Sequence, residues 1–240
     1  MTKDSNKPPL QLARRLFDLL FTDRVSTGAI ALALLAAISL LPGVGVIPGF
    51  LFVLLALVLC MRQGSFAEIG FRRPASWWRT ILLGVGIGVV AQLVFSIVID
   101  PLLGHMTGKP IDVSAFDAVR GNIPNYLILL GVGWVVGGFL EEMLFRGYLL
   151  GRIRRFLGGG QVATFLAVIV PAIAFGLAHR YQGPAGMIST GLLGTLLGVV
   201  FVRYRENLWL PILVHGSLNA VGITLIFISG DRVLNAWLFG

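Results

Sequence analysis

Charged residues are scarce in this sequence: they make up 12% of its 240 residues, whereas hydrophobic residues make up 56%. A soluble globular domain carries roughly twice that share of charge. The mean hydropathy of +0.88 is correspondingly high. These values argue against a soluble enzyme and against a disordered protein.

Several other features are missing. The single cysteine, Cys60, lies in an apolar run, so an intrachain disulfide is excluded and we expect a buried, inert thiol. The first apolar run begins late and no A-x-A site follows it, so we expect no cleavable signal peptide. The net charge is +8, but the basic residues lie between the apolar runs and form no aromatic-interleaved patch, which argues against nucleic acid as a partner.

Long stretches without Asp, Glu, Lys or Arg are what the sequence has in abundance. Each contains at least 20 residues, enough to cross ~30 Å of hydrocarbon as a helix that rises ~1.5 Å per residue. The stretches are 25–61, 80–99, 121–140, 156–178, 181–202 and 207–230. The sequence therefore predicts an all-α integral membrane protein, a polytopic helical bundle embedded in the lipid bilayer.

The first stretch is too long for one span, and Pro42-Gly43 and Pro48-Gly49 interrupt it. We predict two short spans there, which brings the total to about seven, and a loop over 100–124. The remaining polar N-terminal segment has apolar residues at near-helical spacing and predicts a short interfacial helix within 1–24. The predicted spans are 26–41, 48–61, 78–99, 122–150, 161–179, 184–203 and 208–229. In this topology, most Lys and Arg residues lie on the side of the membrane that holds the N-terminus. The positive-inside rule therefore predicts a cytoplasmic N-terminus.

Polar and ionisable side chains within the predicted spans form one concentrated set. Ionisable groups are costly in a membrane, and they commonly mark a functional site. The set comprises Glu141, Glu142 and Arg146 in the fourth span, His179 at the end of the fifth, and His215 with Asn219 in the seventh.

The spacing of the two glutamates predicts different roles for them. Glu142 and Arg146 are four residues apart, so they share a helix face and can form a structural ion pair. Glu141 is rotated by ~100° from Glu142 and lacks that intrahelical partner. One glutamate is thus expected to be neutralised and the other to be free for chemistry.

The histidines follow the same spacing rule. His215 and Asn219 can point into one cavity, and the ring of Phe175 can wall the imidazole of His179. The glycines at 158–160 predict a turn that brings Glu141 and His179 to a similar depth. Straight helices would place His215 nearer the cytoplasmic face, and the sequence leaves its depth open.

Three motifs carry a resemblance to a known family. The segments 141–146, 175–179 and 215–219 match EExxxR, FxxxH and HxxxN in that order. This sequence resembles the type II CAAX prenyl endopeptidase and bacteriocin-processing (CPBP) family of glutamate intramembrane proteases. The resemblance covers 121–229, which would be the catalytic core, after an N-terminal segment at 1–24 and N-terminal transmembrane helices at 25–99.

The resemblance implies a metal-free peptidase without cofactors. Glu141 would act as general base on water, His179 would help to hold that water, and His215 and Asn219 would form the oxyanion hole. Glu142 and Arg146 would be the structural pair. The substrate would be a membrane-embedded or membrane-associated protein or peptide, whether prenylated or not. The short loops resemble those of prokaryotic members, which implies the inner (plasma) membrane.

Three alternatives stay open. Two histidines and two glutamates are possible zinc ligands, although no H-E-x-x-H motif is present. A second is a catalytically silent immunity or regulatory protein of the same family. A third is a proton-coupled transporter, although no inverted repeat is evident.

Overall fold

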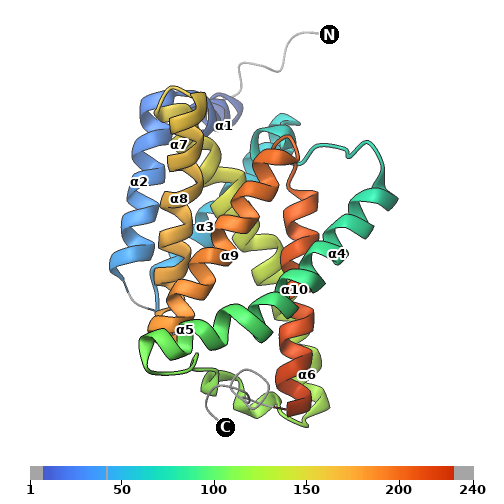
Figure 1. The fold of residues 1–240 in the computed structure, drawn as a ribbon. Coiled ribbons are helices and arrows are strands. Elements are labelled where there is room, and N and C mark those ends of the chain that lie inside the picture. Colours follow the sequence, from blue (N-terminus) through green and yellow to red (C-terminus); the bar gives the residue numbers. More distant parts are fainter. Residues whose placement is uncertain (1–7, 42, 230–240) are drawn as a thin grey trace.

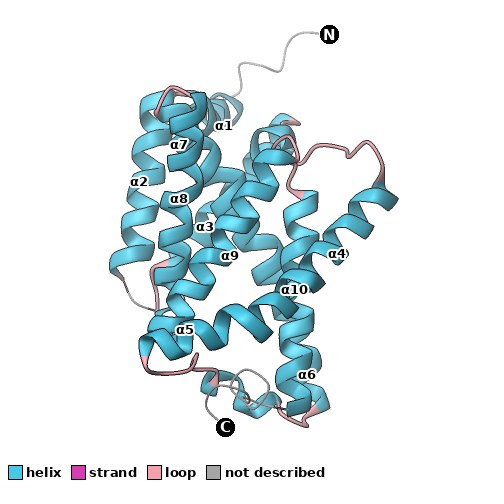
Figure 2. Ribbon diagram, viewed as in Figure 1, coloured by secondary structure: helices cyan, strands magenta, loops and turns pink. Residues whose placement is uncertain are grey.

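The computed structural model describes residues 8–41 and 43–229, which form helices joined by short loops, with no strand among them (Figures 1 and 2). Pro42, one of the residues predicted to break the first stretch, lies outside the described residues, as do residues 1–7 of the predicted N-terminal segment. Six helices are long and apolar enough to cross a membrane, and a bent pair at the N-terminal end would make a seventh. The protein is an all-α polytopic membrane protein, as predicted.

The N-terminal part begins with helix α1 (Pro8–Phe17), which continues as the short π-helical segment η1 (Asp18–Thr22). A bend of 73° separates this helix from α2 (Arg24–Leu40). The side chain of Asp23 caps α2 by accepting a hydrogen bond from the backbone N–H of Ser26 at 2.7 Å. Helix α3 (Val46–Gln63) then runs separately, which confirms the predicted division of the first stretch into two helices.

The third predicted span is longer in the structure than in the prediction. After the 3₁₀ segment η2 (Phe66–Ile69), α4 (Trp77–Val94), η3 (Phe95–Ile99) and α5 (Asp100–Thr107) form a single helical run. The predicted loop over 100–124 was therefore wrong for its first eight residues. Asp100 does not end the helix because it is buried and accepts a hydrogen bond from Ser189. Pro101 lies within this run just after the π-helical segment η3, and local π adjustments let transmembrane helices accommodate proline.

The C-terminal half contains four further helical runs. A short 3₁₀ segment, η4 (Ser114–Val119), precedes the long helix made of α6 (Ile123–Val132), η5 (Gly133–Glu141), η6 (Met143–Leu150) and α7 (Gly151–Phe156). The others are α8 (Gly160–Ala178), then η7 (Arg180–Gln182) with α9 (Gly183–Arg203), and α10 (Trp209–Ser229). The glycines at 158–160 all have positive φ, which confirms the predicted turn.

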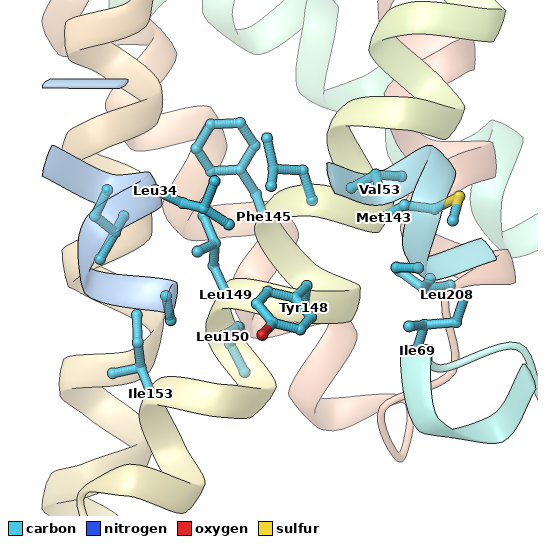
Figure 3. Packing of buried hydrophobic residues seen from close by; sticks show 14 of the residues in the cluster. Leu34, Val53, Ile69, Met143, Phe145, Tyr148, Leu149, Leu150, Ile153 and Leu208 are labelled. Carbon is cyan, nitrogen blue, oxygen red and sulfur yellow. The ribbon is translucent and has the colours of Figure 1, made fainter. Parts of the chain in front are cut away.

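The main apolar core surrounds η6, in which every residue from Met143 to Leu150 is buried (Figure 3). Tyr148 donates a hydrogen bond to the carbonyl oxygen of Leu20 at 3.0 Å, and Arg152 donates one to that of Phe21 at 2.7 Å. These bonds tie the end of the long helix to the N-terminal helices. The outward faces of the helices carry large exposed apolar side chains, as expected for contact with lipid, among them Leu82, Val90, Ile128, Phe165 and Ile173.

Close contact between α4 and α10 depends on glycine. A Cβ at Gly84 would lie 2.4 Å from Cβ of Leu213, and one at Gly88 would lie 2.4 Å from the carbonyl oxygen of Val214. Small residues at this four-residue spacing let two helix backbones approach closely. Helix α10, which carries His215 and Asn219, is thereby held between α4 and η5.

Candidate active site

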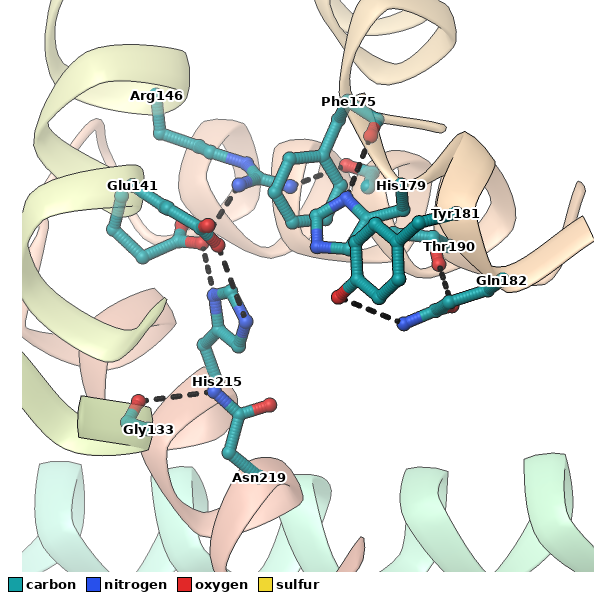
Figure 4. A network of polar contacts seen from close by, with 12 residues as sticks. Gly133, Glu141, Arg146, Phe175, His179, Tyr181, Gln182, Thr190, His215 and Asn219 are labelled. Atoms are coloured by element: carbon teal, nitrogen blue, oxygen red, sulfur yellow. Dashed lines mark hydrogen bonds and ion pairs between the residues drawn. The ribbon is translucent and has the colours of Figure 1, made fainter. Parts of the chain in front are cut away.

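Three helices that are distant in sequence bring the predicted polar residues together (Figure 4). Glu141 is the last residue of η5, His179 follows the end of α8, and His215 lies near the start of α10. Figure 4 shows their side chains converging from these separate elements. The η5 and η6 backbone is π-helical, a geometry found frequently at functional sites.

Glu142 lies at the centre of a buried network of charged groups. Its Oε1 is 2.7 Å from Nη1 of Arg146, and both side chains are almost completely buried. Arg146 also donates a hydrogen bond to the carbonyl oxygen of Gly194 at 3.0 Å, and its guanidinium lies 5.0 Å from the centre of the Phe175 ring. The structure thus contains the expected ion pair. The hydrogen bond from Arg146 to Gly194 also fixes the long helix to α9.

Glu142 has a second partner that the sequence did not predict. Its Oε1 is 2.7 Å from Nδ1 of His215. A carboxylate only accepts hydrogen bonds, so the Nδ1–H of His215 donates to Glu142. With its side chain 0% exposed, Glu142 is held by two partners and closed off from the cavity beside it.

Glu141 has a different environment. Its Oε2 lies 3.8 Å from Nε2 of His215, on the opposite nitrogen from Glu142, and its side chain is 16% exposed. No hydrogen bond to another described side chain engages its carboxylate at shorter range. The imidazole of His215 therefore stands between a closed carboxylate and an accessible one.

The depth of His215, left open by the sequence, follows from the helix ends. The long helix continues to Phe156, beyond its predicted end at residue 150. Figure 1 shows that the turn between α7 and α8 lies higher, toward the top of the view, than the connection between α9 and α10. Because the ends of these helices are offset, His215 reaches the level of the glutamates although it lies near the start of α10.

His179 is oriented by its own helix. Its Nδ1 is 2.9 Å from the carbonyl oxygen of Phe175, and the two rings lie 4.8 Å apart. A carbonyl oxygen can only accept, so Nδ1 carries the proton. In the neutral ring the lone pair is then on Nε2, which makes Nε2 an acceptor.

Asn219 is fixed by η5. Its Nδ2 donates a hydrogen bond to the carbonyl oxygen of Gly133 at 2.9 Å, which leaves its second N–H for another acceptor. A Cβ at Gly137 would lie 2.3 Å from this Nδ2. Glycine at this position therefore leaves the room that the amide needs.

The predicted residues line one cavity of about 270 Å³. Glu141, His179, His215 and Asn219 all contribute to its wall, whereas Glu142 does not. Its volume approaches the ~300 Å³ at which small-molecule sites begin. Hydrogen-bond acceptors and donors therefore face the same cavity.

Comparison with known proteins agrees with the motifs. Residues 123–221, which include all of these side chains, match the model of a family described as type II CAAX prenyl endopeptidase Rce1-like. This segment therefore resembles the Rce1-like family. The membrane-embedded CAAX protease MroQ of Staphylococcus aureus (strain USA300) is similar, with 25% identity over 154 residues. That match covers 61% of this chain and 56% of MroQ, so the chain aligns with about half of the length of this curated relative. No solved structure matches the chain.

The Rce1-like segment does not form the cavity alone. Gln92 of α4 and Phe116 of η4, both from outside the matched residues, also line it, and so do Tyr181 and Gln182 of η7. Sequence reasoning missed these four residues. Gln92 is an amide inside a charge-free stretch, so a search for polar groups in spans could have found it, whereas the others lie in loop segments whose path depends on the fold.

A zinc site would need at least three ligating side chains close together. Within residues 8–41 and 43–229, no group of three or more His, Cys, Asp or Glu side chains is arranged to hold a metal ion. The candidate site brings His215 close to the carboxylates of Glu141 and Glu142, whereas His179 bonds to a backbone carbonyl through its Nδ1.

Proposed function

We propose that this protein is an intramembrane endopeptidase that hydrolyses a peptide bond with water activated by Glu141, without a metal ion. The observation that carries the proposal is the contrast between the two glutamates on His215. Glu142 is closed and bonded, while Glu141 faces the cavity that His179 and Asn219 share. The match of residues 123–221 to a family described as type II CAAX prenyl endopeptidase Rce1-like supports the reaction class.

Glu141 and His179 form the water-binding side of the site. A water molecule has two O–H groups to donate, and the carboxylate of Glu141 and Nε2 of His179 are both acceptors. A water held by both directs an oxygen lone pair toward the carbonyl carbon of a bound peptide. As that oxygen attacks, Glu141 takes one of its protons, which is general base catalysis.

His215 and Asn219 form the oxyanion side. The free N–H of Asn219 donates to the oxygen of the tetrahedral intermediate. His215 donates through Nε2 when both of its nitrogens carry a proton, since its Nδ1–H is already bound to Glu142. In that state Arg146 and the His215 imidazolium balance the charges of the two carboxylates. The intermediate then collapses, the C–N bond breaks, and Glu141 returns its proton to the leaving amine.

The substrate we propose is a membrane-embedded or membrane-associated protein or peptide. We assign 121–229 as the catalytic core, 25–99 as the N-terminal transmembrane helices and 1–24 as the cytoplasmic or interfacial segment. The charge distribution along the chain supports an N-terminus in the cytoplasm of a prokaryote and insertion in the inner membrane.

Purified protein in nanodiscs tests this function directly. The wild-type chain and a Glu141→Gln variant would be incubated with a library of single-span and amphipathic peptides, with products identified by mass spectrometry. We expect discrete internal cleavage by wild type and none by the variant. Equal cleavage by both proteins would contradict the role of Glu141 as general base, and no products from a folded wild type over the whole library would contradict the proposed activity.

A further inference from the structure

A second cavity, of about 170 Å³, adjoins the candidate active site. His179, His215 and Asn219 line both cavities, so the second one opens directly beside the reacting centre. Its other walls come partly from α5, α9 and the segment before α6, which carry no motif residue, and partly from α4, η7, α10 and Phe175 of α8. We call this second space the rear lobe. In Figure 1 the α4–α5 helix crosses the bundle obliquely, which is how α5 reaches α9.

A buried carboxylate lines the rear lobe. Asp100 is 8% exposed and accepts one hydrogen bond, from Oγ of Ser189 at 2.6 Å. In the described part of the chain, no Lys, Arg or His side chain forms an ion pair with it. Two further polar side chains, Thr190 and Gln182, are joined by a 3.2 Å hydrogen bond on the same wall. A buried carboxylate with only a neutral partner is costly to ionise, and a cation beside it offsets that cost.

We infer that the rear lobe is a substrate subsite for a lysine or arginine side chain next to the scissile bond, with Asp100 as the group that pairs with the cation. This inference rests on the proposed function, because it assigns specificity to the same active site. Asp100 would then decide which peptides are cleaved, while taking no part in the proton transfers.

The shape of the rear lobe fits such a side chain. A water molecule occupies about 30 Å³ in the liquid, so the cavity has room for much more than one water. Its other walls are apolar, with Val113, Leu193 and Leu197 among them. Lysine and arginine combine an aliphatic stem with a charged head, and they bury the stem against apolar surface while the head meets a polar partner.

A packing role alone would not require this arrangement. The bond from Ser189 to Asp100 does fasten α9 to α5. An asparagine–serine pair would fasten the same helices without a buried charge. The carboxylate at the wall of a cavity that shares His179, His215 and Asn219 with the reaction site is what points to a cationic ligand.

Two peptides that differ at one position test the inference. One carries lysine and the other methionine next to the scissile bond, so that length is matched and charge is not. Removing one member of a buried charge pair costs at least ~2 kcal/mol, so we expect wild type to prefer the lysine peptide by about 30-fold in kcat/KM. In Asp100→Asn this ratio should fall close to one. Asp112→Asn is the matched control, because Asp112 is exposed and does not line the lobe, and it should keep the wild-type ratio.

Binding separates this inference from the proposed function. Dissociation constants of the two peptides would be measured with Glu141→Gln and with the Glu141→Gln/Asp100→Asn double variant. Lysine selectivity that disappears in the double variant supports the subsite even if no turnover is detected. If wild type cleaves peptides but ignores the charge at every position of a scanning library, the subsite is wrong while the protease stands. That library needs no Asp100 variant, so it decides the question even if Asp100→Asn fails to fold.

Discussion

The two ends of one long helix differ sharply in burial. In α6 no residue is buried, whereas in η6 every residue is. Between them, η5 buries three glycines, of which Gly133 and Gly137 face Asn219. The first part of the helix thus faces lipid and the cavity, and the last part is enclosed by the N-terminal helices and α8.

The two glutamates lie at the boundary between these parts, and this explains how adjacent identical residues come to differ. Glu142 belongs to the enclosed part, where Arg146 and His215 both bond its Oε1 and where its Oε2 is buried without a hydrogen-bond partner. Glu141 belongs to the open part and faces the cavity. A carboxylate in the core must be paired, whereas one at a cavity wall can exchange protons with a bound water.

The largest effect on stability is expected from Glu142→Gln. The substitution leaves Arg146 buried without its carboxylate, which should cost about 3–5 kcal/mol. Unfolding of the purified protein in detergent, followed by circular dichroism or differential scanning fluorimetry, measures this loss. Glu68→Gln is the control: Glu68 lies 3.6 Å from Arg152 and is 40% exposed, so its loss should cost about 1 kcal/mol or less. Unchanged stability in Glu142→Gln would mean that the enclosed part does not depend on this pair.

A smaller effect, confined to turnover, is expected from Asn219→Ala. Losing one donor to an oxyanion costs about 10²–10³ in rate. Because that donor meets only the transition state, kcat and kcat/KM should fall together while KM changes little. Steady-state kinetics with a fluorogenic peptide in nanodiscs measures this, with Ser229→Ala on the same helix as the control. A large rise in KM at constant kcat would assign Asn219 to substrate binding instead.

The open part of the helix offers a matched pair of glycines. In Gly137→Ala the new Cβ meets Nδ2 of Asn219 at 2.3 Å, so the amide must move, and activity should fall roughly 10- to 100-fold. In Gly131→Ala the new Cβ meets nothing within 4 Å, and activity should stay near that of wild type. Equal rates in the two variants would show that the position of Asn219 does not limit the reaction.

The smallest effect is expected from metal removal. Exhaustive dialysis against EDTA and 1,10-phenanthroline should leave the cleavage rate unchanged, because water is activated by Glu141 in this account. Elemental analysis of the active protein should find much less than one zinc per chain. Activity that is lost with chelation and restored by zinc would reassign the histidines as ligands.

Much of this comparison could be predicted from local sequence. The charge-free stretches gave the helices, and the four-residue spacing gave the pair of Glu142 with Arg146, because both depend on neighbours along one helix. The contact between His215 and Glu142 could not be predicted in this way. It depends on how far two helices are offset along the bundle, which is a property of their packing.

Asp100 escaped the sequence analysis for a related reason. A charged residue commonly ends a membrane span, so the sequence predicts a loop at Asp100. In the structure the helix continues through it, since Ser189 of another helix satisfies its carboxylate. Whether a polar residue ends a helix or lies within it depends on partners that only the fold provides.

The central claim, that the adjacent glutamates have separate roles, is tested most directly by comparing Glu141→Gln and Glu142→Gln in one assay. Single-turnover cleavage of the same peptide would be measured in nanodiscs, at a temperature where circular dichroism finds both variants folded. We predict that the cleavage rate of Glu141→Gln is about 10⁴-fold below that of wild type or at background, because the variant lacks the general base. Its unfolding temperature should equal that of wild type. Glu142→Gln should retain measurable cleavage but unfold at a lower temperature. A stable, inactive Glu142→Gln beside an active Glu141→Gln would contradict the account.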